Sequence, residues 1–318
     1  MALATPITEL FEIRHPVLLA PMAGASGGAL AAAVSAAGGL GLIAGGYGNA
    51  GQLEAEFVAA GNARVGVGFI TWSLARQPAL LTQALEHAPA AVFLSFGDDA
   101  PFSDEIHRAG AKLICQVQTV EQARAAADAS ADVIVAQGSE AGGHGASRGT
   151  FALVPAVVDA VAPLPVLAAG GIGDGRGLGA ALLLGAAGAV VGTRFLATTE
   201  CLWPDGFKQR LLESGGDDTL RTSLFDRLRG LDWPAEYTGR VLRNDSTERW
   251  QANPQAPGGG DTARSDYDAA ASDDADTRAL HAGEVLDLVD AVIPAAHLVE
   301  KIVAEAEAEL ARAARLVT

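Results

Sequence analysis

The chain has 318 residues, of which 49% are hydrophobic and only 5% aromatic, so it is long enough for one large α/β barrel or two ordinary domains. Its 38 acidic residues exceed its 22 Lys and Arg, and the formal net charge of −16 argues against nucleic acid or an anionic membrane surface as partner. The two cysteines, Cys115 and Cys201, are too few for a disulfide framework and no secretory signal is recognisable, so we expect free thiols in a cytoplasmic protein.

An uncharged stretch runs over residues 16–53. Pro21 and repeated glycines divide it into short strands and a small-residue helix, whereas a membrane-spanning helix needs about 20 uninterrupted apolar residues. We therefore expect no transmembrane segment here.

Short apolar runs recur and alternate with Ala- and Leu-rich segments of helical pattern, such as residues 120–130 and 177–185. Eight runs have the character of buried parallel strands: residues 17–20, 40–44, 65–70, 91–96, 112–117, 133–137, 165–169 and 189–192. This alternation predicts an α/β fold, the (β/α)₈ TIM barrel, with a doubly wound sheet as the alternative. The barrel is favoured because the glycine-rich loops follow the strands and would gather on one rim.

We expect the barrel to occupy residues 1–200. A smaller, mainly helical subdomain with an acidic flexible loop is predicted over residues 201–279, where residues 251–277 are polar, acidic and poor in apolar side chains. Over residues 280–318, the apolar spacing predicts C-terminal helices that return to the barrel. The subdomain holds three of the four tryptophans and offers an interface for a homo-oligomer, a state that the sequence leaves open.

Residues 133–148 carry the strongest functional signal. The apolar strand ends at Gln137 and opens into a glycine-rich turn with Glu140 and His144. Glycines allow backbone shapes that side chains forbid and the close approach of a flat ligand, and histidine exchanges a proton near neutral pH. We predict that His144 is catalytic, the alternative being a histidine that only caps a loop. Glu140 is interpreted as holding the turn through backbone N–H groups.

Two further glycine loops follow the last two predicted strands, with Gly170 and Gly171 in one and Gly192 and Thr193 in the other. TIM barrels commonly bind phosphate at this place, through backbone amides and a helix N-terminus. Arg194 either adds a positive charge there or forms a salt bridge at the rim. No G-x-G-x-x-G fingerprint and no P-loop occur, so we do not expect a Rossmann cofactor site.

Taken together, these motifs resemble those of the nitronate monooxygenase (nitropropane dioxygenase) family, a group of FMN-dependent TIM-barrel enzymes. In chain order they are PMAG at 21–24, AGGLG at 37–41, AQGSEAGGH at 136–144, AAGGIGDG at 168–175, GTRF at 192–195 and GRVLRN from 239. The resemblance covers most of the chain except the acidic loop.

The resemblance implies non-covalent FMN on the barrel rim. The cofactor-binding positions that it implies are Pro21, Met22, Ala23, Gly24, Gln137, Gly142, Gly143, Gly170, Gly171, Gly192 and Thr193. The ring would lie near residues 21–24 and the phosphate near the two later glycine loops. His144 matches the family's catalytic histidine, which would orient the nitronate or act as general base while FMN carries the redox chemistry; no metal is required.

The activity implied is oxidation of small alkyl nitronates with O2 to carbonyl compounds and nitrite. One departure stands out: relatives often carry Gly-Gln before the last apolar run, whereas this chain has Gly283-Glu284-Val285, so a polar contact to the nitro group or flavin would be missing. An NAD(P)H-dependent flavin reductase of quinones or enoyl thioesters remains open on the same fold. A remoter alternative is a phosphate-binding barrel without redox chemistry.

Overall fold

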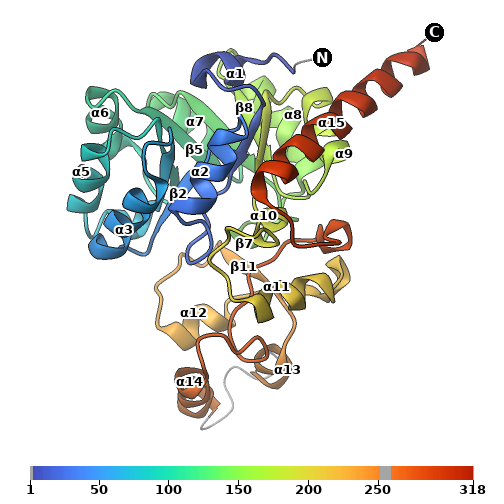
Figure 1. Cartoon of the computed structure of the whole chain (residues 1–318). Coiled ribbons are helices and arrows are strands. Elements are labelled where there is room, and N and C mark those ends of the chain that lie inside the picture. Colours follow the sequence, from blue (N-terminus) through green and yellow to red (C-terminus); the bar gives the residue numbers. More distant parts are fainter. Residues whose placement is uncertain (1–2, 251–258, 318) are drawn as a thin grey trace.

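Eight parallel strands form one curled sheet in the computed structural model, which describes residues 3–250 and 259–317 (Figure 1). The strands are β1 (Val17–Leu19), β2 (Leu42–Gly46), β3 (Gly66–Ile70), β4 (Ala91–Ser95), β5 (Lys112–Val117), β6 (Val133–Gln137), β8 (Val166–Ala169) and β9 (Gly188–Val191). They are hydrogen-bonded in the order β1-β9-β8-β6-β5-β4-β3-β2. The remaining gap is closed by a parallel bridge between Leu18 and Leu40, with the Leu19 N–H donating to the Leu40 carbonyl at 3.0 Å. The predicted TIM barrel is therefore confirmed.

Side chains of each strand alternate between two hydrophobic cores. The barrel interior takes Leu18, Phe93 and Leu167, all essentially buried. The side chains of the opposite face, such as Leu94 and Ile134, pack beneath the surrounding helices. Because both faces of the sheet are covered, the strands are unbroken apolar runs in the sequence.

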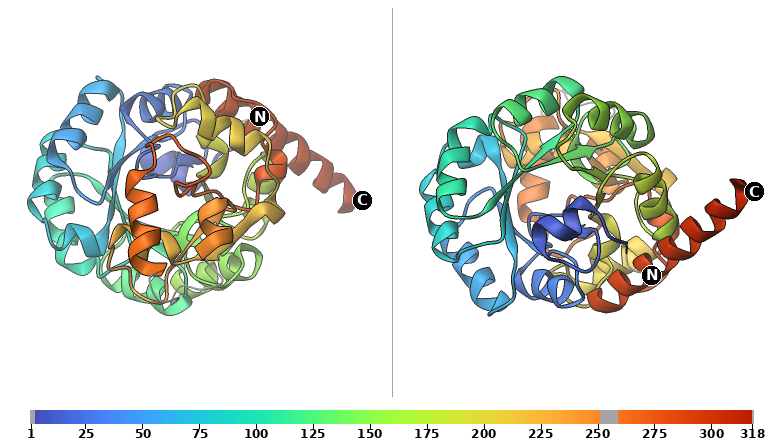
Figure 2. Two further views of the ribbon diagram at one scale, coloured as in Figure 1. Left: turned by 90° about the horizontal axis from the view of Figure 1, so that it is seen from below. Right: turned by 90° about the horizontal axis from the view of Figure 1, so that it is seen from above.

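Helices connect the strands and cover the outside of the barrel (Figure 2). They are α2 (Gly28–Ala36), α3 (Ala50–Ala60), α4 (Thr71–Leu74), α5 (Ala79–Glu86), α6 (Ala100–Arg108), α7 (Val120–Asp128), α8 (Thr150–Val161), α9 (Gly175–Leu183) and α10 (Thr193–Leu196). The side chains of Asn49, Thr119 and Asp174 each accept a hydrogen bond from a backbone N–H in the first turn of the following helix. These caps satisfy amides that have no partner within the helix and mark where each loop ends.

The two ends of the barrel are covered differently. Helix α1 (Pro6–Phe11) lies over one end, and its Ile7 and Phe11 join the core of the barrel interior. The opposite end, where the strands have their carboxyl termini, faces the small subdomain (Figures 1 and 2). The loops of that end are therefore free to build a site, while α1 packs against the barrel interior.

The small subdomain contains α11 (Asp205–Leu212), a 3₁₀ turn η1 (Gly216–Asp218), β10 (Thr219–Thr222), α12 (Leu224–Arg229), β11 (Thr238–Leu242), α13 (Asp245–Trp250) and α14 (Gly259–Ala269). Its own core includes Leu220, Phe225 and Val241. Strands β10 and β11 pair antiparallel, and β11 pairs in turn with β7 (Gly143–Gly145), which leaves the barrel after β6. The helices were expected, but this three-stranded sheet was not.

An acidic flexible loop was predicted over residues 251–277, but residues 259–269 form the helix α14; residues 251–258 lie outside the described part. The sequence is polar, yet Ala263 and Tyr267 are four positions apart and so lie on one face of a helix. Both are buried, and the Tyr267 ring lies 6.0 Å from that of Phe225. These two apolar side chains at helical spacing pack the helix against the core of the subdomain.

The chain returns to the barrel through α15 (Ala295–Ala314), which packs on α9 and α2 and projects beyond them (Figure 1). The Gly175 N–H donates to the Glu305 carboxylate at 3.0 Å. Residues 280–294 are mostly loop, with one turn η2 (Leu286–Leu288), rather than the predicted helix; a further turn η3 (Arg315–Val317) follows α15. Within the described ranges, no helix has both the length and the apolar character needed to cross a bilayer.

We predict that Phe11→Ala lowers the free energy of unfolding by about 3–5 kcal/mol, because Phe11 is 0% exposed and its loss opens a cavity at the closed end of the barrel. The matched variant Phe151→Ala removes a ring that is 74% exposed and should change stability by less than about 0.5 kcal/mol. Denaturant unfolding of both proteins measures the difference. Equal effects would contradict the role of α1 as a structural plug.

Candidate active site

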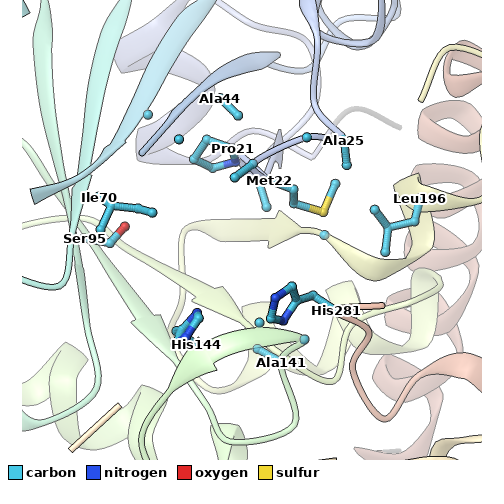
Figure 3. Close-up of a pocket in the computed structure, with 18 of the residues that line it drawn as sticks. Pro21, Met22, Ala25, Ala44, Ile70, Ser95, Ala141, His144, Leu196 and His281 are labelled. Atoms are coloured by element: carbon cyan, nitrogen blue, oxygen red, sulfur yellow. The ribbon is translucent and has the colours of Figure 1, made fainter. Parts of the chain in front are cut away.

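A cavity of about 580 Å³ opens at the carboxyl ends of the barrel strands. It brings together all of the site residues predicted from sequence, which are Pro21, Met22, Ala23, Gly24, Gln137, Gly142, Gly143, His144, Gly170, Gly171, Gly192 and Thr193. Figure 3 shows Pro21 and Met22 on one side of this space and His144 on the other. Loops that are distant in sequence thus share one site.

The turn after β1 presents an apolar surface to the cavity. The Ser26 hydroxyl accepts a hydrogen bond from the Met22 N–H at 3.2 Å and donates to the Ala20 carbonyl at 2.8 Å. Pro21 packs over Gly68, where a Cβ would lie 2.3 Å from the Pro21 ring. This turn is therefore rigid and shaped for a flat ligand, while Met22 also packs against the surrounding core.

Thr150, at the start of α8, hydrogen-bonds to the glycine loop after β8. Gly170 and Gly171 have φ angles of 95° and 73°, a region that favours glycine. Thr150 donates from its hydroxyl to the Gly170 carbonyl at 3.0 Å. The Glu140 carboxylate accepts from the Thr150 N–H at 2.9 Å. Glu140 thus supports two loops of the rim, in keeping with the structural interpretation of this residue.

The loop after β9 is tied to the C-terminal segment. The Thr193 hydroxyl accepts from the Gly283 N–H at 2.9 Å. The Arg194 guanidinium is buried and lies 3.5 Å from the Asp290 carboxylate. Burial lowers the pKa of Arg194, with Asp290 acting in the opposite direction. Of the two interpretations of Arg194, the structure shows the ion pair.

His144 is positioned by β7. Gly143, with φ of 76°, makes the turn into this strand, and a Cβ on Gly142 would lie 2.7 Å from the backbone of the C-terminal segment. The Gln137 amide donates to the His144 carbonyl at 3.1 Å and accepts from the Gln118 amide at 2.9 Å. Gly142, Gly143 and Gln137 therefore help to position the imidazole of His144.

Two arginines of the small sheet clamp the same loop. Arg221 donates to the carbonyls of Ser139 and Gly145, and Arg240 donates to the Ser139 carbonyl at 3.0 Å. Burial and the neighbouring charge of Arg240 lower the pKa of Arg221 to about 10. Arg221 therefore remains charged at neutral pH and joins the barrel loop to the subdomain.

Asp226, which sequence reasoning missed, is the partner of His144. Both carboxylate oxygens of Asp226 lie 3.0 Å from His144 Nε2, and the two side chains are only 7% and 6% exposed. Because a carboxylate accepts hydrogen bonds, Nε2 carries the proton of the neutral ring and Nδ1 keeps its lone pair. His144 is thus arranged to accept a proton at Nδ1, and Asp226 to stabilise the imidazolium that forms.

An aromatic wall covers the other side of His144. The Trp233 indole stacks on the imidazole with ring centroids 3.4 Å apart and an interplanar angle of 2°, and its Nε1–H donates to the Tyr47 hydroxyl at 3.1 Å. Phe96, whose φ of 67° is rare for a residue with a side chain, meets Trp233 edge-on at 5.1 Å. This wall excludes water from the His144–Asp226 pair.

Residues 4–64 and 76–305 match the sequence profile described as nitronate monooxygenase. The chain belongs to this family. Members are flavin-dependent oxidoreductases, and this chain is accordingly an oxidoreductase.

The chain is similar to proteins that are named for different activities. It is 38% identical over 261 residues to a nitronate monooxygenase of Metarhizium robertsii, covering 72% of this chain and 73% of the relative. It is 35% identical over 263 residues to the (3aS,4S,5R,7aS)-5-hydroxy-7a-methyl-1-oxo-octahydro-1H-indene-4-carboxyl-CoA dehydrogenase of Mycobacterium tuberculosis, covering 81% and 71%. The structure of FabK from Thermotoga maritima superposes with a TM-score of 0.85 at 30% identity, covering 98% of this chain and 99% of that one.

We predict that Asp226→Asn lowers kcat by about 100-fold or more, because an amide N–H directed at Nε2 would favour the opposite tautomer of His144. Ring ¹⁵N chemical shifts of His144 should report that change directly. Asp232→Asn is the matched control, because the Asp232 side chain is 79% exposed and faces Arg76 on the surface. An Asp226→Asn enzyme with unchanged turnover and tautomer would show that the pair has no catalytic task.

Proposed function

We propose that this protein is an FMN-dependent nitronate monooxygenase that oxidises small alkyl nitronates with O2 to carbonyl compounds and nitrite. The observation that carries the proposal is that His144, which is paired with Asp226, lines the same cavity as the apolar turn of residues 21–24 and the glycine loops after β8 and β9. A proton-handling group, a flat apolar surface and a cradle of backbone amides thus converge on one space.

The residues present fit FMN. Gly170, Gly171, Gly192 and Thr193 would hold the phosphate through backbone groups where Cβ atoms are largely absent. The turn from Pro21 to Gly24 would support the ring, with Gln137 at its edge. FMN, when bound, supplies the oxidation–reduction chemistry between nitronate and O2.

The remaining space favours a small substrate. The cavity of about 580 Å³ must hold the flavin as well as the substrate, and Trp233 with Tyr47 closes the side next to His144. His144 then binds and orients the nitronate when its Nδ1 carries a proton, or removes a proton from a neutral nitroalkane when it does not. Asp226 keeps the ring in the orientation that both tasks need.

Reduction of a thioester-linked substrate by NAD(P)H is the second candidate. Arg278 and Arg229 line the cavity, with their guanidinium groups 4.6 Å and 5.0 Å from the rings of Tyr267 and Tyr47. Such charges near the opening suit the phosphates of a thioester carrier or a nicotinamide nucleotide. The name of the Mycobacterium tuberculosis relative, a carboxyl-CoA dehydrogenase, is likewise that of an oxidoreductase with a thioester-linked substrate.

Anaerobic stopped-flow absorbance of the flavin-loaded protein separates the two. We expect rapid flavin reduction by propyl nitronate, slow or no reduction by NADH and NADPH, and nitrite when air is admitted. Fast reduction by a nicotinamide nucleotide alone would contradict the monooxygenase and move the assignment to a reductase.

We predict that His144→Asn retains bound flavin but lowers turnover of propyl nitronate by about 10²- to 10⁴-fold, the usual contribution of a general acid–base group. His107→Asn is the matched control, because His107 also bonds a carboxylate, Asp132 at 2.9 Å, but lies on the outer helices. Steady-state kinetics measures both variants. Full turnover by His144→Asn would remove His144 from the catalytic role.

A further inference from the structure

A tyrosine borders the cavity from the loop that follows β2. Tyr47 comes directly after this strand and is one of the residues that line the cavity. Its carbonyl accepts hydrogen bonds from the Ser73 hydroxyl at 3.0 Å and from the Gln77 amide at 3.1 Å. Gly46 and Gly48, with φ angles of 56° and 94°, make the turn on either side of it. The backbone thus holds this side chain at a defined place on the rim.

The protein uses the Tyr47 hydroxyl as an acceptor. The Trp233 Nε1–H donates to it at 3.1 Å, and the Arg229 guanidinium also donates to it. A phenol oxygen carries one O–H in addition to its lone pairs. Among the residues that the structure describes, none accepts a hydrogen bond from this O–H. Because Tyr47 lines the cavity, its proton is available to a ligand there.

Tyr47 and His144 contact the same indole. Tyr47 meets Trp233 at the edge that carries Nε1, with the two rings 6.3 Å apart and nearly perpendicular at 87°. His144 stacks on the face of the same indole, with ring centroids 3.4 Å apart. A hydrogen-bond donor and a proton-exchanging imidazole therefore lie on one wall of the cavity, separated by a single side chain.

We propose that Tyr47 is a substrate-binding residue whose hydroxyl donates a hydrogen bond to an oxygen of the nitronate group while His144 acts on the same molecule. This inference rests on the proposed function. A nitronate carries its negative charge on oxygen, and hydrogen bonds to charged acceptors are stronger than those between neutral groups. The donors Trp233 and Arg229 polarise the phenol and so strengthen the bond that its O–H makes.

The charge state of Tyr47 suits this role. Burial raises the pKa of Tyr47, while the charge of Arg229 and the hydrogen bond from Trp233 act in the opposite direction and Asp226 adds to the increase. Because the ordinary pKa of tyrosine is about 10, a raised pKa leaves the phenol uncharged throughout the neutral range. The substrate would then be held between a donor that keeps its proton and a histidine that exchanges one.

Glu284 does not supply this contact. Its side chain is 44% exposed, and its carboxylate lies 2.7 Å from the Arg240 guanidinium. The polar group expected near Gly283-Glu284-Val285 is thus engaged elsewhere, and Glu284 does not line the cavity, whereas Tyr47 does.

The test compares two variants of the flavin-loaded enzyme, Tyr47→Phe and Trp233→Phe. KM and kcat are measured with propyl nitronate, and the dissociation constant of nitrite is measured from the absorbance change of the bound flavin. We expect Tyr47→Phe to raise KM and the nitrite dissociation constant by about 10- to 100-fold, the loss of one hydrogen bond to a charged group, with kcat changed by less than about 3-fold. Trp233→Phe breaks the same Tyr47–Trp233 bond but leaves the hydroxyl in place, so nitrite affinity should fall much less.

Tyr237→Phe is the matched control. Tyr237 belongs to the same aromatic wall, with its ring 5.0 Å from that of Phe96, but its hydroxyl bonds to the Gln122 amide at 2.8 Å and the residue does not line the cavity. This variant should leave KM and nitrite affinity unchanged.

Unchanged KM and nitrite affinity in Tyr47→Phe would overturn the proposal. Equal losses of nitrite affinity in Tyr47→Phe and Trp233→Phe would also overturn it, because Tyr47 would then act only by holding Trp233. Wild-type enzyme that binds nitrite but does not oxidise propyl nitronate would overturn the proposed function alone, leaving the nitrite titration to decide the role of Tyr47.

Discussion

The antiparallel pairing of β7 with β11 is the constraint on which the site depends. It draws a glycine loop of the barrel into a sheet of the small subdomain, with His144 directly opposite Gly239. The helix that carries Asp226 and the loop that carries Trp233 both lie between β10 and β11, so the same pairing brings them to the imidazole. Without this sheet, the barrel would retain its cradle of glycines but His144 would lose both its partner and its cover.

Burial strengthens the hydrogen bond between His144 and Asp226, but it also removes water from the Asp226 carboxylate. A carboxylate withdrawn from water loses hydration that only well-placed hydrogen bonds offset. Paired contacts to both Asp226 oxygens, the stacked indole and the clamps from Arg221 and Arg240 provide that geometry. The barrel itself contributes rigidity, because its closed ring of hydrogen bonds and filled interior cannot deform locally.

The barrel can be predicted from the sequence because strands that are buried on both faces are continuous apolar runs, and because glycine loops mark the ends of these strands. The predicted site residues line one cavity for the same reason, since carboxyl ends of parallel strands share one rim. Asp226 could not be found this way. Asp226 lies 82 residues from His144, and the pairing that unites them involves β7, whose Gly-His-Gly sequence has no strand character. Helix α14 was missed because two buried side chains outweigh a polar composition there.

We propose that the cavity lined by His144 holds a flavin mononucleotide, and every role proposed for the site depends on this. Releasing the chromophore from purified, heat-denatured protein and identifying it by mass tests this directly. We expect one FMN per chain. Protein that carries no flavin and takes up none when FMN is added would contradict it.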